Sequence, residues 1–235
     1  MYKNYIKRFL DRAVSFILIL LLFPLLILIS FLIYFETHKF PIIIQERAIA
    51  LNKKRIRIFK FRTFKENQIP LFYSSQNILS HPELFKYVTI TGMFLRLTGL
   101  DELPQLLNVI KGEMSLIGPR PLIIEDLRHI KIYYPDLYKE REKIEVKPGI
   151  TGLWQISKDD DFSVEYLIKK DTEYQSNLSF INDVKILLNT LKVAVLMKHK
   201  DSLKVSKESY YLIWLFNFVV NLYILLLMVI FLNKI

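Results

Sequence analysis

The chain has no cysteine and only four histidines among its 235 residues. Without cysteine, neither a disulfide framework nor a thiolate metal site can form. The histidines, His38, His81, His129 and His199, show no spacing typical of metal ligands, so no zinc site is predicted. Acidic residues are also scarce, 23 against 33 basic ones, which gives a net charge of +10. This excess predicts anionic partners, namely phosphates, acidic lipids or nucleic acid.

A stretch without any charged side chain runs from Ala13 to Phe35, over 23 residues. A helix needs about 20 apolar residues to cross the hydrocarbon core of a bilayer, so this stretch predicts a membrane segment. It is longer than the apolar part of a signal peptide, and no small-residue cleavage site follows it. The other interpretation is a buried helix of a soluble protein, and the length argues against it.

The charges around this stretch favour a hairpin that enters and leaves the membrane on one side. Basic residues mark the cytoplasmic end of a membrane helix, and here they flank both ends. Pro24, near the middle, removes a helical hydrogen bond and predicts a kink. A re-entrant helix–break–helix accounts for both observations, and a straight span is the alternative. The flanking residues are Lys3, Lys7, Arg8 and Arg12 before the stretch, and Lys39, Arg47, Lys53, Lys54, Arg55 and Arg57 after it.

The stretch Leu100–Pro121 holds the residues with the clearest chemistry. Asp101 and Glu102 stand side by side at the start of a short predicted helix, with Asp101 in the N-cap position. Lys111-Gly112 is a stop signal for this helix. Apolar residues at helical spacing are predicted to form its buried face, and these are Leu103, Leu106, Leu107 and Ile110.

A buried strand, Met114–Ile117, and a stiff turn, Gly118–Pro121, are predicted next. Two prolines fix φ on either side of Arg120 and make the backbone there rigid. The Arg120 guanidinium could therefore bind a phosphate through two hydrogen bonds. An ionised Asp101 could attack phosphorus, and Glu102 could hold Mg²⁺. These residue types together are typical of phosphoryl transfer. For the Asp-Glu pair alone, a helix cap with favourable charges is the plainer interpretation.

Further basic residues suit a phosphate-binding surface. The segment Arg55–Arg62 reads R-I-R-I-F-K-F-R, which alternates like a strand and puts Lys60 and Arg62 on one face. That face either binds phosphate or lies exposed at a sheet edge or on anionic lipid. Arg96 is another candidate phosphate ligand. Lys147–Gly152 predicts a turn whose glycines allow a positive φ or a close backbone approach, and an ordinary hairpin turn is the alternative.

The apolar pattern predicts several further elements. A second apolar stretch, Tyr210–Leu232, is 23 residues long and follows a group of lysines. It is expected to span the membrane from a cytoplasmic N-terminal end, and an interfacial or partner-binding helix is the alternative. The other predicted elements are a β segment at Pro41–Ile44, a helix at Leu122–Tyr134, a short strand at Trp154–Ile156, and a structural amphipathic helix at Ser179–Lys198 with Val184, Leu187, Leu188, Leu191 and Val195 on its apolar face.

Five motifs, in order behind the first apolar stretch, resemble the bacterial sugar transferase family. These are small monotopic phosphoglycosyl transferases that start polyprenyl-linked glycan assembly. The resemblance runs from about Tyr5 to about Met197. One such motif would be a weak signal, but five in this order are specific. They are K-F-R-T at 60–63, L-D-E-L-P-Q-L-L-N-V at 100–109, G-E-M-S-L-I-G-P-R-P at 112–121, K-P-G-I-T-G-L-W-Q at 147–155 and N-L-S-F-I-N-D-V-K-I-L at 177–187.

The resemblance implies an α+β, mainly helical fold with short β segments. Residues 1–38 would form the re-entrant membrane anchor. Residues 39–200 would form a compact catalytic domain on the cytoplasmic face of the bacterial inner membrane. Residues 208–235 would form an additional apolar segment, which small family members usually lack.

The resemblance also implies a reaction. A sugar-1-phosphate would pass from a nucleoside diphosphate sugar, usually a UDP-sugar, to polyprenyl (undecaprenyl) phosphate, with release of UMP and with Mg²⁺ as cofactor. Membrane lipid is an implied partner and nucleic acid is not, while a homo-oligomer or contacts with glycosyltransferases of the same pathway stay open. The family's nucleophile falls on Asp101, and its metal ligands fall on Asp101 and Glu102. The implied substrate or phosphate contacts are Lys60, Arg62, Arg96, Pro119, Arg120, Pro121 and Lys147, the membrane break is Pro24, and Asp171 matches an acidic position of open role.

The sequence departs from the family after Gln155, where a small residue and then Gly-Arg are usual. Here Ile156, Ser157 and Lys158 follow instead. Lysine lacks the bidentate fork of arginine, so the role of Lys158 and the choice of donor are open. Two other functions fit parts of the sequence. One is a non-catalytic basic protein of the membrane surface, and the other is a glycosyltransferase that moves the bare sugar and releases UDP.

Overall fold

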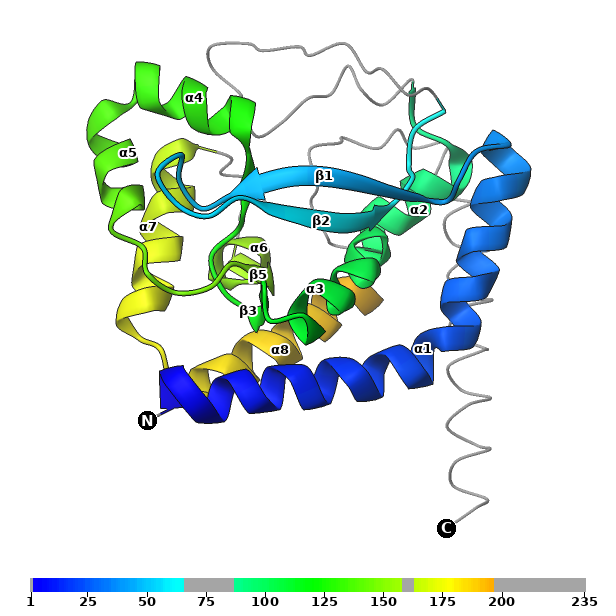
Figure 1. Cartoon of the computed structure of the whole chain (residues 1–235), viewed down its shortest axis with the longest axis horizontal. Coiled ribbons are helices and arrows are strands. Elements are labelled where there is room, and N and C mark those ends of the chain that lie inside the picture. Colours follow the sequence, from blue (N-terminus) through cyan, green and yellow to red (C-terminus); the bar gives the residue numbers. More distant parts are fainter. Residues whose placement is uncertain (1, 66–86, 158–162, 197–235) are drawn as a thin grey trace.

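The computed structural model describes residues 2–65, 87–157 and 163–196 (Figure 1). Lys158 and the second apolar stretch, Tyr210–Leu232, lie outside the described residues. The described chain is mainly helical with a few short strands, which confirms the predicted fold class at this level. Its helices are α1 (Lys7–Thr37), α2 (Ile90–Thr98), α3 (Leu106–Ile110), α4 (Ile124–Tyr133), α5 (Pro135–Glu142), α6 (Leu153–Ser157), α7 (Val164–Ser176) and α8 (Phe180–Val195), with a π-helical turn at Tyr2–Ile6 and a 3₁₀ helix at Leu100–Gln105.

The strands form two small sheets. In the first sheet β1 is central and pairs antiparallel with β2 and β4, and in the second sheet β3 and β5 are parallel. The register of the first sheet runs from Ile42 opposite Phe61 to Arg47 opposite Ile56. The strands are β1 (Ile42–Ala48), β2 (Ile56–Phe61), β3 (Ser115–Ile117), β4 (Leu122–Ile123) and β5 (Gly149–Thr151).

The charge-free stretch forms the body of α1, which is long and apolar enough to cross a membrane. The helix contains Pro24, and Figure 1 shows that it runs along one side of the molecule and then turns sharply. Proline has no N–H and collides with the carbonyl four residues earlier, which causes bends of this kind. The predicted kink is therefore present, but the structure has one bent helix where two helices separated by a break were expected. The helix ends at His38, whose φ of 53° is left-handed.

Both halves of α1 pack against the rest of the protein. In the second half, Leu25, Ile29 and Ile33 join Phe61 and Leu95 in a buried cluster. This contact sets the helix beside the end of β2.

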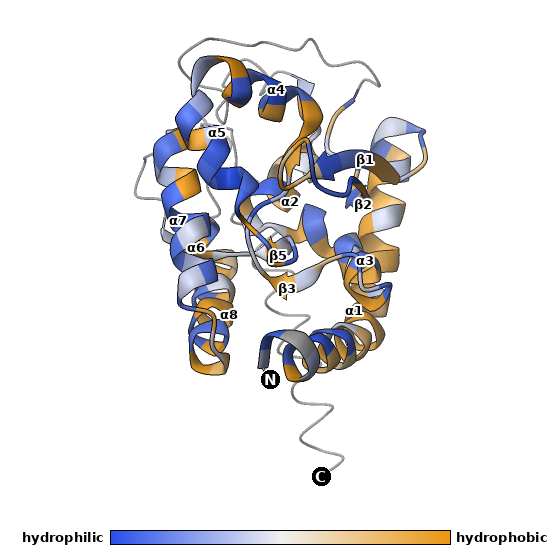
Figure 2. Cartoon of the chain, turned by 60° about the vertical axis from the view of Figure 1, so that its left-hand side comes forward, coloured by the Kyte–Doolittle hydropathy of each residue, from blue (hydrophilic) through white to orange (hydrophobic). Residues whose placement is uncertain are grey.

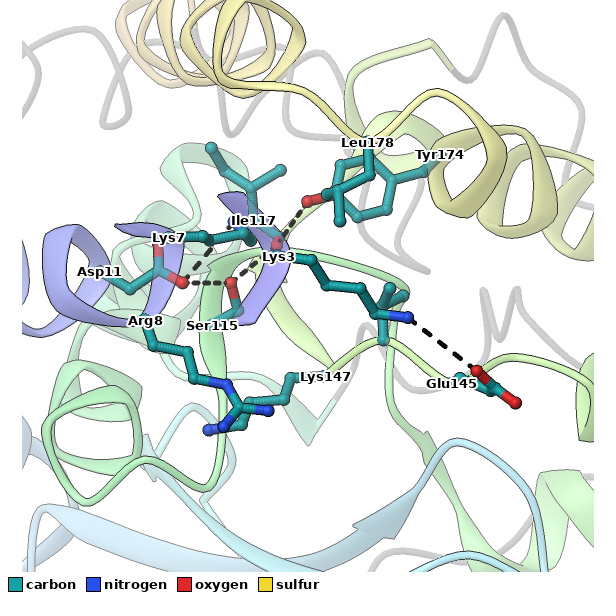
Figure 3. Close-up of a pocket in the computed structure, with 11 residues that line it drawn as sticks. Lys3, Lys7, Arg8, Asp11, Ser115, Ile117, Glu145, Lys147, Tyr174 and Leu178 are labelled. Carbon is teal, nitrogen blue, oxygen red and sulfur yellow. Dashed lines mark hydrogen bonds and ion pairs between the residues drawn. The ribbon is translucent and has the colours of Figure 1, made fainter. Parts of the chain in front are cut away.

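The first half of α1 is held by polar contacts (Figure 3). The Lys7 ammonium lies 2.7 Å from a carboxylate oxygen of Asp183 on α8. The Ser115 hydroxyl of β3 donates to Asp11 at 2.5 Å, and the Tyr174 hydroxyl of α7 donates to the Ile117 carbonyl at 2.9 Å. These contacts tie the start of α1 to β3, whose end leads into the turn that carries Arg120.

The segment Lys147–Gly152 contains the strand β5 and is not a hairpin turn, because β5 pairs in parallel with β3. A Cβ atom on Gly149 would collide with the backbone of Gly118, and one on Gly152 would collide with the Gly118 carbonyl. The predicted close backbone approach is confirmed. Positive φ among the described glycines occurs instead at Gly99 and Gly112.

Two further sequence predictions need correction. The predicted strand Trp154–Ile156 is helix α6, since a short apolar run does not distinguish a strand from a helix by its periodicity. In α3, Val109 is buried and Leu107 is exposed, so the apolar face differs from the predicted one. The 3₁₀ helix before α3 has 3.0 residues per turn, which rotates the following residues relative to a continuous α-helix.

Candidate active site

Asp101 and Glu102 lie in the 3₁₀ helix between α2 and α3, with 2% and 6% of their surfaces exposed. Gly99, at a φ of 75°, ends α2 and turns the chain into this helix. The prediction that Asp101 is the N-cap is wrong, because Gly99 takes that position and Asp101 lies in the first turn. The two carboxylates are buried side by side, so they require nearby positive charge.

Lys60 supplies that charge. Its ammonium lies 3.1 Å from Asp101 Oδ2 and 3.0 Å from Glu102 Oε1. In β2 the side chains of Ile56, Ile58 and Lys60 share the buried face, while Arg57 is exposed. The alternation of the strand therefore turns Lys60 inward, and the exposed-edge interpretation of this segment is wrong for Lys60.

Arg120 approaches the pair from the turn that follows β3. Both terminal nitrogens of its guanidinium lie 3.4 Å from Glu102 Oε1, and its Cζ atom lies over the ring of Trp154, 5.6 Å from the ring centre. The carbonyls of the neighbouring prolines fix the position of the turn. The Pro119 carbonyl accepts a hydrogen bond from the Gly149 N–H, and the Pro121 carbonyl accepts one from the Arg47 side chain. The structure thus brings together four predicted site residues, Lys60, Asp101, Glu102 and Arg120.

Asp171 lies behind this turn and is fully buried on α7. One of its oxygens accepts from Arg141 at 2.8 Å, and the other accepts from the Arg120 backbone N–H at 3.3 Å. Burial raises the pKa of Asp171 to about 6, against the lowering effect of Arg141. Asp171 therefore contacts the backbone of the site and not the carboxylate pair itself.

Arg62 and Arg96 contact the chain on either side of the carboxylate pair's neighbouring strand, β2. Arg62 donates from Nε to the Phe40 carbonyl at 3.0 Å. Arg96 donates from Nε to the Thr63 hydroxyl at 3.0 Å and lies over the ring of Phe64. These contacts hold the segment that follows β2, and a direct role on phosphate stays a prediction.

Lys147 points toward the start of α1. Its ammonium donates to the Gly112 carbonyl at 2.5 Å, and it lines the same pocket as Arg8 (Figure 3). Burial, together with Arg8 and Arg12, lowers the pKa of Lys147. In this arrangement Lys147 contributes to a group of cations at the start of α1.

Two charged residues near the turn had not been predicted. Arg141 on α5 is completely buried, although it stands in the polar run Y-K-E-R-E-K that is typical of a solvated helix. Asp126 on α4 is also buried, and its Oδ1 has no hydrogen-bond partner among the described residues. Burial raises the pKa of Asp126 to about 7, and the nearby Arg47, Arg120 and Arg141 lower it. No sequence signal pointed to either residue, because a local pattern does not show which charges become buried.

Asp101 and Glu102 are the candidate ligands for Mg²⁺. Within the described ranges, no three His, Cys, Asp or Glu side chains gather as a metal cage. Asp101 and Glu102 supply two adjacent carboxylates, and Mg²⁺ is commonly held by one or two carboxylates together with substrate phosphates and water. The residues present therefore fit Mg²⁺, with the remaining ligands coming from a diphosphate and solvent.

Comparisons with known proteins place the chain in a family. Residues 2–197 match the bacterial sugar transferase family. The exopolysaccharide production protein ExoY of Sinorhizobium fredii is 33% identical over 82% of this chain and 86% of its own length. The undecaprenyl-phosphate galactose phosphotransferase of Salmonella typhimurium is 31% identical over 82% of this chain and 41% of its own length.

A third relative is the UDP-glucose:undecaprenyl-phosphate glucose-1-phosphate transferase of Klebsiella pneumoniae. It is 34% identical over 79% of this chain and 39% of its own length. The chain thus spans most of ExoY and about two fifths of the two longer transferases. The family match covers every residue of the site, from Lys60 through Asp171. The chain belongs to the bacterial sugar transferase family.

Proposed function

We propose that this enzyme transfers a sugar-1-phosphate from a UDP-sugar to undecaprenyl phosphate and releases UMP, as the first membrane step of glycan assembly. The observation that carries the proposal is the buried pair Asp101 and Glu102, held between Lys60 and Arg120. Two negative and two positive side chains suit a reaction that moves a phosphoryl group between two phosphate-bearing substrates. The names of the Salmonella and Klebsiella relatives support the lipid acceptor and the sugar phosphate.

Asp101 is the proposed nucleophile. Its recorded bond to Lys60 uses Oδ2, so within the described chain Oδ1 is available for attack. Glu102 is approached by two cations, Lys60 and Arg120, and their combined positive charge makes its carboxylate the weaker nucleophile. We infer that Asp101 Oδ1 attacks the phosphorus that bears the sugar, the bond to the UMP oxygen breaks, and a phosphosugar-aspartate forms.

In the second half of the reaction, an oxygen of undecaprenyl phosphate attacks the same phosphorus and the aspartate leaves unchanged. The product is undecaprenyl diphosphate sugar, so atoms and charge balance over the two steps. Lys60 and Arg120 stabilise the negative charge that develops on the transferred group. Mg²⁺, held by Asp101 and Glu102, would neutralise charge on the diphosphate.

The acceptor is a lipid, which makes the surface of α1 relevant. The side of α1 that faces away from the protein carries large apolar side chains, and so does α8, where Val184, Leu188, Leu191 and Val195 are all exposed. Figures 1 and 2 show both helices on the same side of the molecule. We infer that this side lies in and on the cytoplasmic leaflet of the bacterial cell membrane, so that the acceptor phosphate reaches the site from the membrane surface.

The released nucleotide tests the reaction. Membranes that contain the protein would be mixed with undecaprenyl phosphate, Mg²⁺ and a panel of UDP-sugars, and UMP and UDP would be measured. UMP release is expected from the native chain and is lost in Asp101→Asn. The exposed Asp136 on α5 provides a matched control, since Asp136→Asn removes a solvent-exposed carboxylate whose ion pair is with Lys139, and it is expected to keep the activity. Release of UDP would establish a glycosyltransferase, and no release with any donor would favour a non-catalytic surface protein.

The nucleophile is tested separately by omitting the acceptor. A donor labelled in the sugar then leaves its label on the protein in stoichiometric amounts. The label is absent in Asp101→Asn and still forms, more slowly, in Glu102→Gln. The reverse pattern would assign the nucleophile to Glu102.

A further inference from the structure

Arg141 is the most deeply buried basic side chain of the described protein, with 0% of its surface exposed. It makes three bonds at three different sites. Its Nε donates to the Ile49 carbonyl at 2.7 Å, its Nη1 to Asp171 at 2.8 Å, and its Nη2 to the Arg120 carbonyl at 2.5 Å. Only the planar fork of arginine can satisfy three acceptors in these directions.

Asp171 completes the arrangement around Arg120. It accepts from Arg141 with one oxygen and from the backbone N–H of Arg120 with the other. The ion pair therefore binds both the N–H and the carbonyl of Arg120. Pro119 and Pro121 also restrict φ on either side of Arg120. The backbone at Arg120 is therefore fixed by two hydrogen bonds and by two neighbouring prolines.

The Arg120 side chain extends from this fixed backbone to Glu102 at 3.4 Å. A shift of the Arg120 backbone would move its guanidinium by a similar distance. A guanidinium binds phosphate through two parallel hydrogen bonds only when it is accurately placed. Stability alone does not account for the pair, because a buried ion pair contributes no more than apolar side chains of similar volume in many proteins. The raised pKa of Asp171 indicates that its ionised form is kept at a cost.

We propose that Arg141 and Asp171 are positioning residues that hold the backbone of Arg120 so that its guanidinium faces the transferred phosphate. The role of Arg120 itself rests on the proposed function. Neither Arg141 nor Asp171 touches the substrate in this proposal, and both act only through Arg120.

A double-mutant cycle tests the proposal. The value of kcat/KM for UMP release is measured for the native chain, Asp171→Asn, Arg120→Ala and the double variant. We expect Asp171→Asn to lower kcat/KM about 10-fold in the native background and less than 2-fold in the Arg120→Ala background. An equal loss in both backgrounds would mean that Asp171 acts on general stability, and the proposal would be wrong.

Asp183 on α8 provides a matched control. It is also a buried carboxylate in an ion pair, with Lys7, but its recorded bonds do not reach the turn that carries Arg120. Asp183→Asn is expected to change kcat/KM by the same factor with and without Arg120. Arg141→Lys is expected to show the same coupling to Arg120 as Asp171→Asn, because lysine keeps the charge but its single nitrogen cannot reach the three acceptors that three guanidinium nitrogens bind.

Hydrogen exchange tests the positioning without any activity. Amide exchange of the purified protein in detergent is compared for the native chain, Asp171→Asn and Arg141→Lys. Faster exchange confined to peptides that contain Arg120 is expected in both variants. Unchanged exchange there, or a uniform increase that includes β1, would overturn the proposal. If no donor releases UMP, the proposed function fails, and the exchange data still decide whether the pair holds the backbone.

Discussion

At the scale of single residues, the site depends on one ammonium between two carboxylates. Lys60 lies within 3.1 Å of Asp101 and Glu102, and all three side chains are buried. Two ionised carboxylates side by side in a protein interior repel each other unless a cation stands between them. Lys60 therefore bridges the two carboxylates and offsets their negative charge before any substrate binds.

Replacing Lys60 by methionine is expected to lower kcat for UMP release by about 100-fold, because one preorganised cation is lost from the site. Steady-state assays in membranes would measure the change. Arg57→Met on the exposed face of the same strand is the control and should retain nearly full activity. A Lys60→Met variant as active as the control would show that the ammonium is not needed.

Asp126 predicts a pH dependence of stability. Burial raises its pKa to about 7, so between about pH 4 and pH 7 the folded chain keeps a proton that the unfolded chain has lost. The contribution of this group to stability therefore falls as the pH rises through that window. Above pH 7 the buried carboxylate is charged, which lowers the free energy of unfolding. Asp126→Asn removes this cost, which is at most about 4 kcal/mol for a pKa raised from 3.8 to about 7.

Thermal unfolding in detergent at pH 5 and pH 8 would measure this effect. Asp126→Asn should raise Tm at pH 8 and change it much less at pH 5. Asp136→Asn, at an exposed site, should give the same small difference at both pH values. An equal gain for Asp126→Asn at both pH values would argue against a buried, titrating carboxyl.

At the scale of elements, α1 is the unusual one. A straight helix of its 31 residues would be about 46 Å long, well over the hydrocarbon thickness of about 30 Å. The bend in α1 shortens its reach, and Pro24 is the residue inside the helix that cannot donate a backbone hydrogen bond. These features, with basic residues at both ends, support a hairpin that stays on one side of the membrane.

Cysteine labelling tests this topology, because the chain has no cysteine of its own. Single cysteines at Tyr5 and Lys39 should both resist a membrane-impermeant maleimide added from the periplasmic side. In Pro24→Leu, which restores the missing hydrogen bond, a straighter α1 should cross the membrane and expose one of the two. Reaction at one end in the native sequence would rule out the hairpin.

At the scale of the whole molecule, the spacing of apolar residues predicts a structural amphipathic helix at Ser179–Lys198, which corresponds to α8. The helix is present, but Leu188 on its apolar face is 61% exposed, and the buried residues of α8 are Asp183 and Ile186. The apolar residues of this amphipathic helix are thus exposed, and Figures 1 and 2 show α8 on the same side of the molecule as α1. An exposed apolar face of this kind marks a surface that contacts a membrane or another protein.

A fluorophore on a single cysteine can report what covers α8. At Leu188→Cys, an environment-sensitive label should shift its emission to shorter wavelength in lipid nanodiscs and be quenched by spin-labelled lipids. The same label at Lys139→Cys, on an exposed part of α5, should do neither. Equal quenching at the two positions would contradict contact between α8 and the membrane.

The sequence by itself determined the apolar helix with its proline, the Asp101-Glu102 pair and the stiff turn at Arg120, because each depends only on neighbouring residues. Spacing, the fixed φ of proline and a run without charge are local properties, and they predicted these features correctly. The N-cap at Asp101 and the strand at Trp154 failed, since glycine geometry and tertiary packing outweighed the local pattern there.

Only the tertiary structure decided which charges meet. Lys60 reaches the carboxylate pair because β1 and β2 form a sheet whose inner face lies on the 3₁₀ helix. Arg141 reaches Arg120 because α5 packs against α7 behind the turn. Contacts between residues so far apart in the chain depend on how the elements pack. Burial then decides which of the many charges of a basic chain lose water and must find a partner.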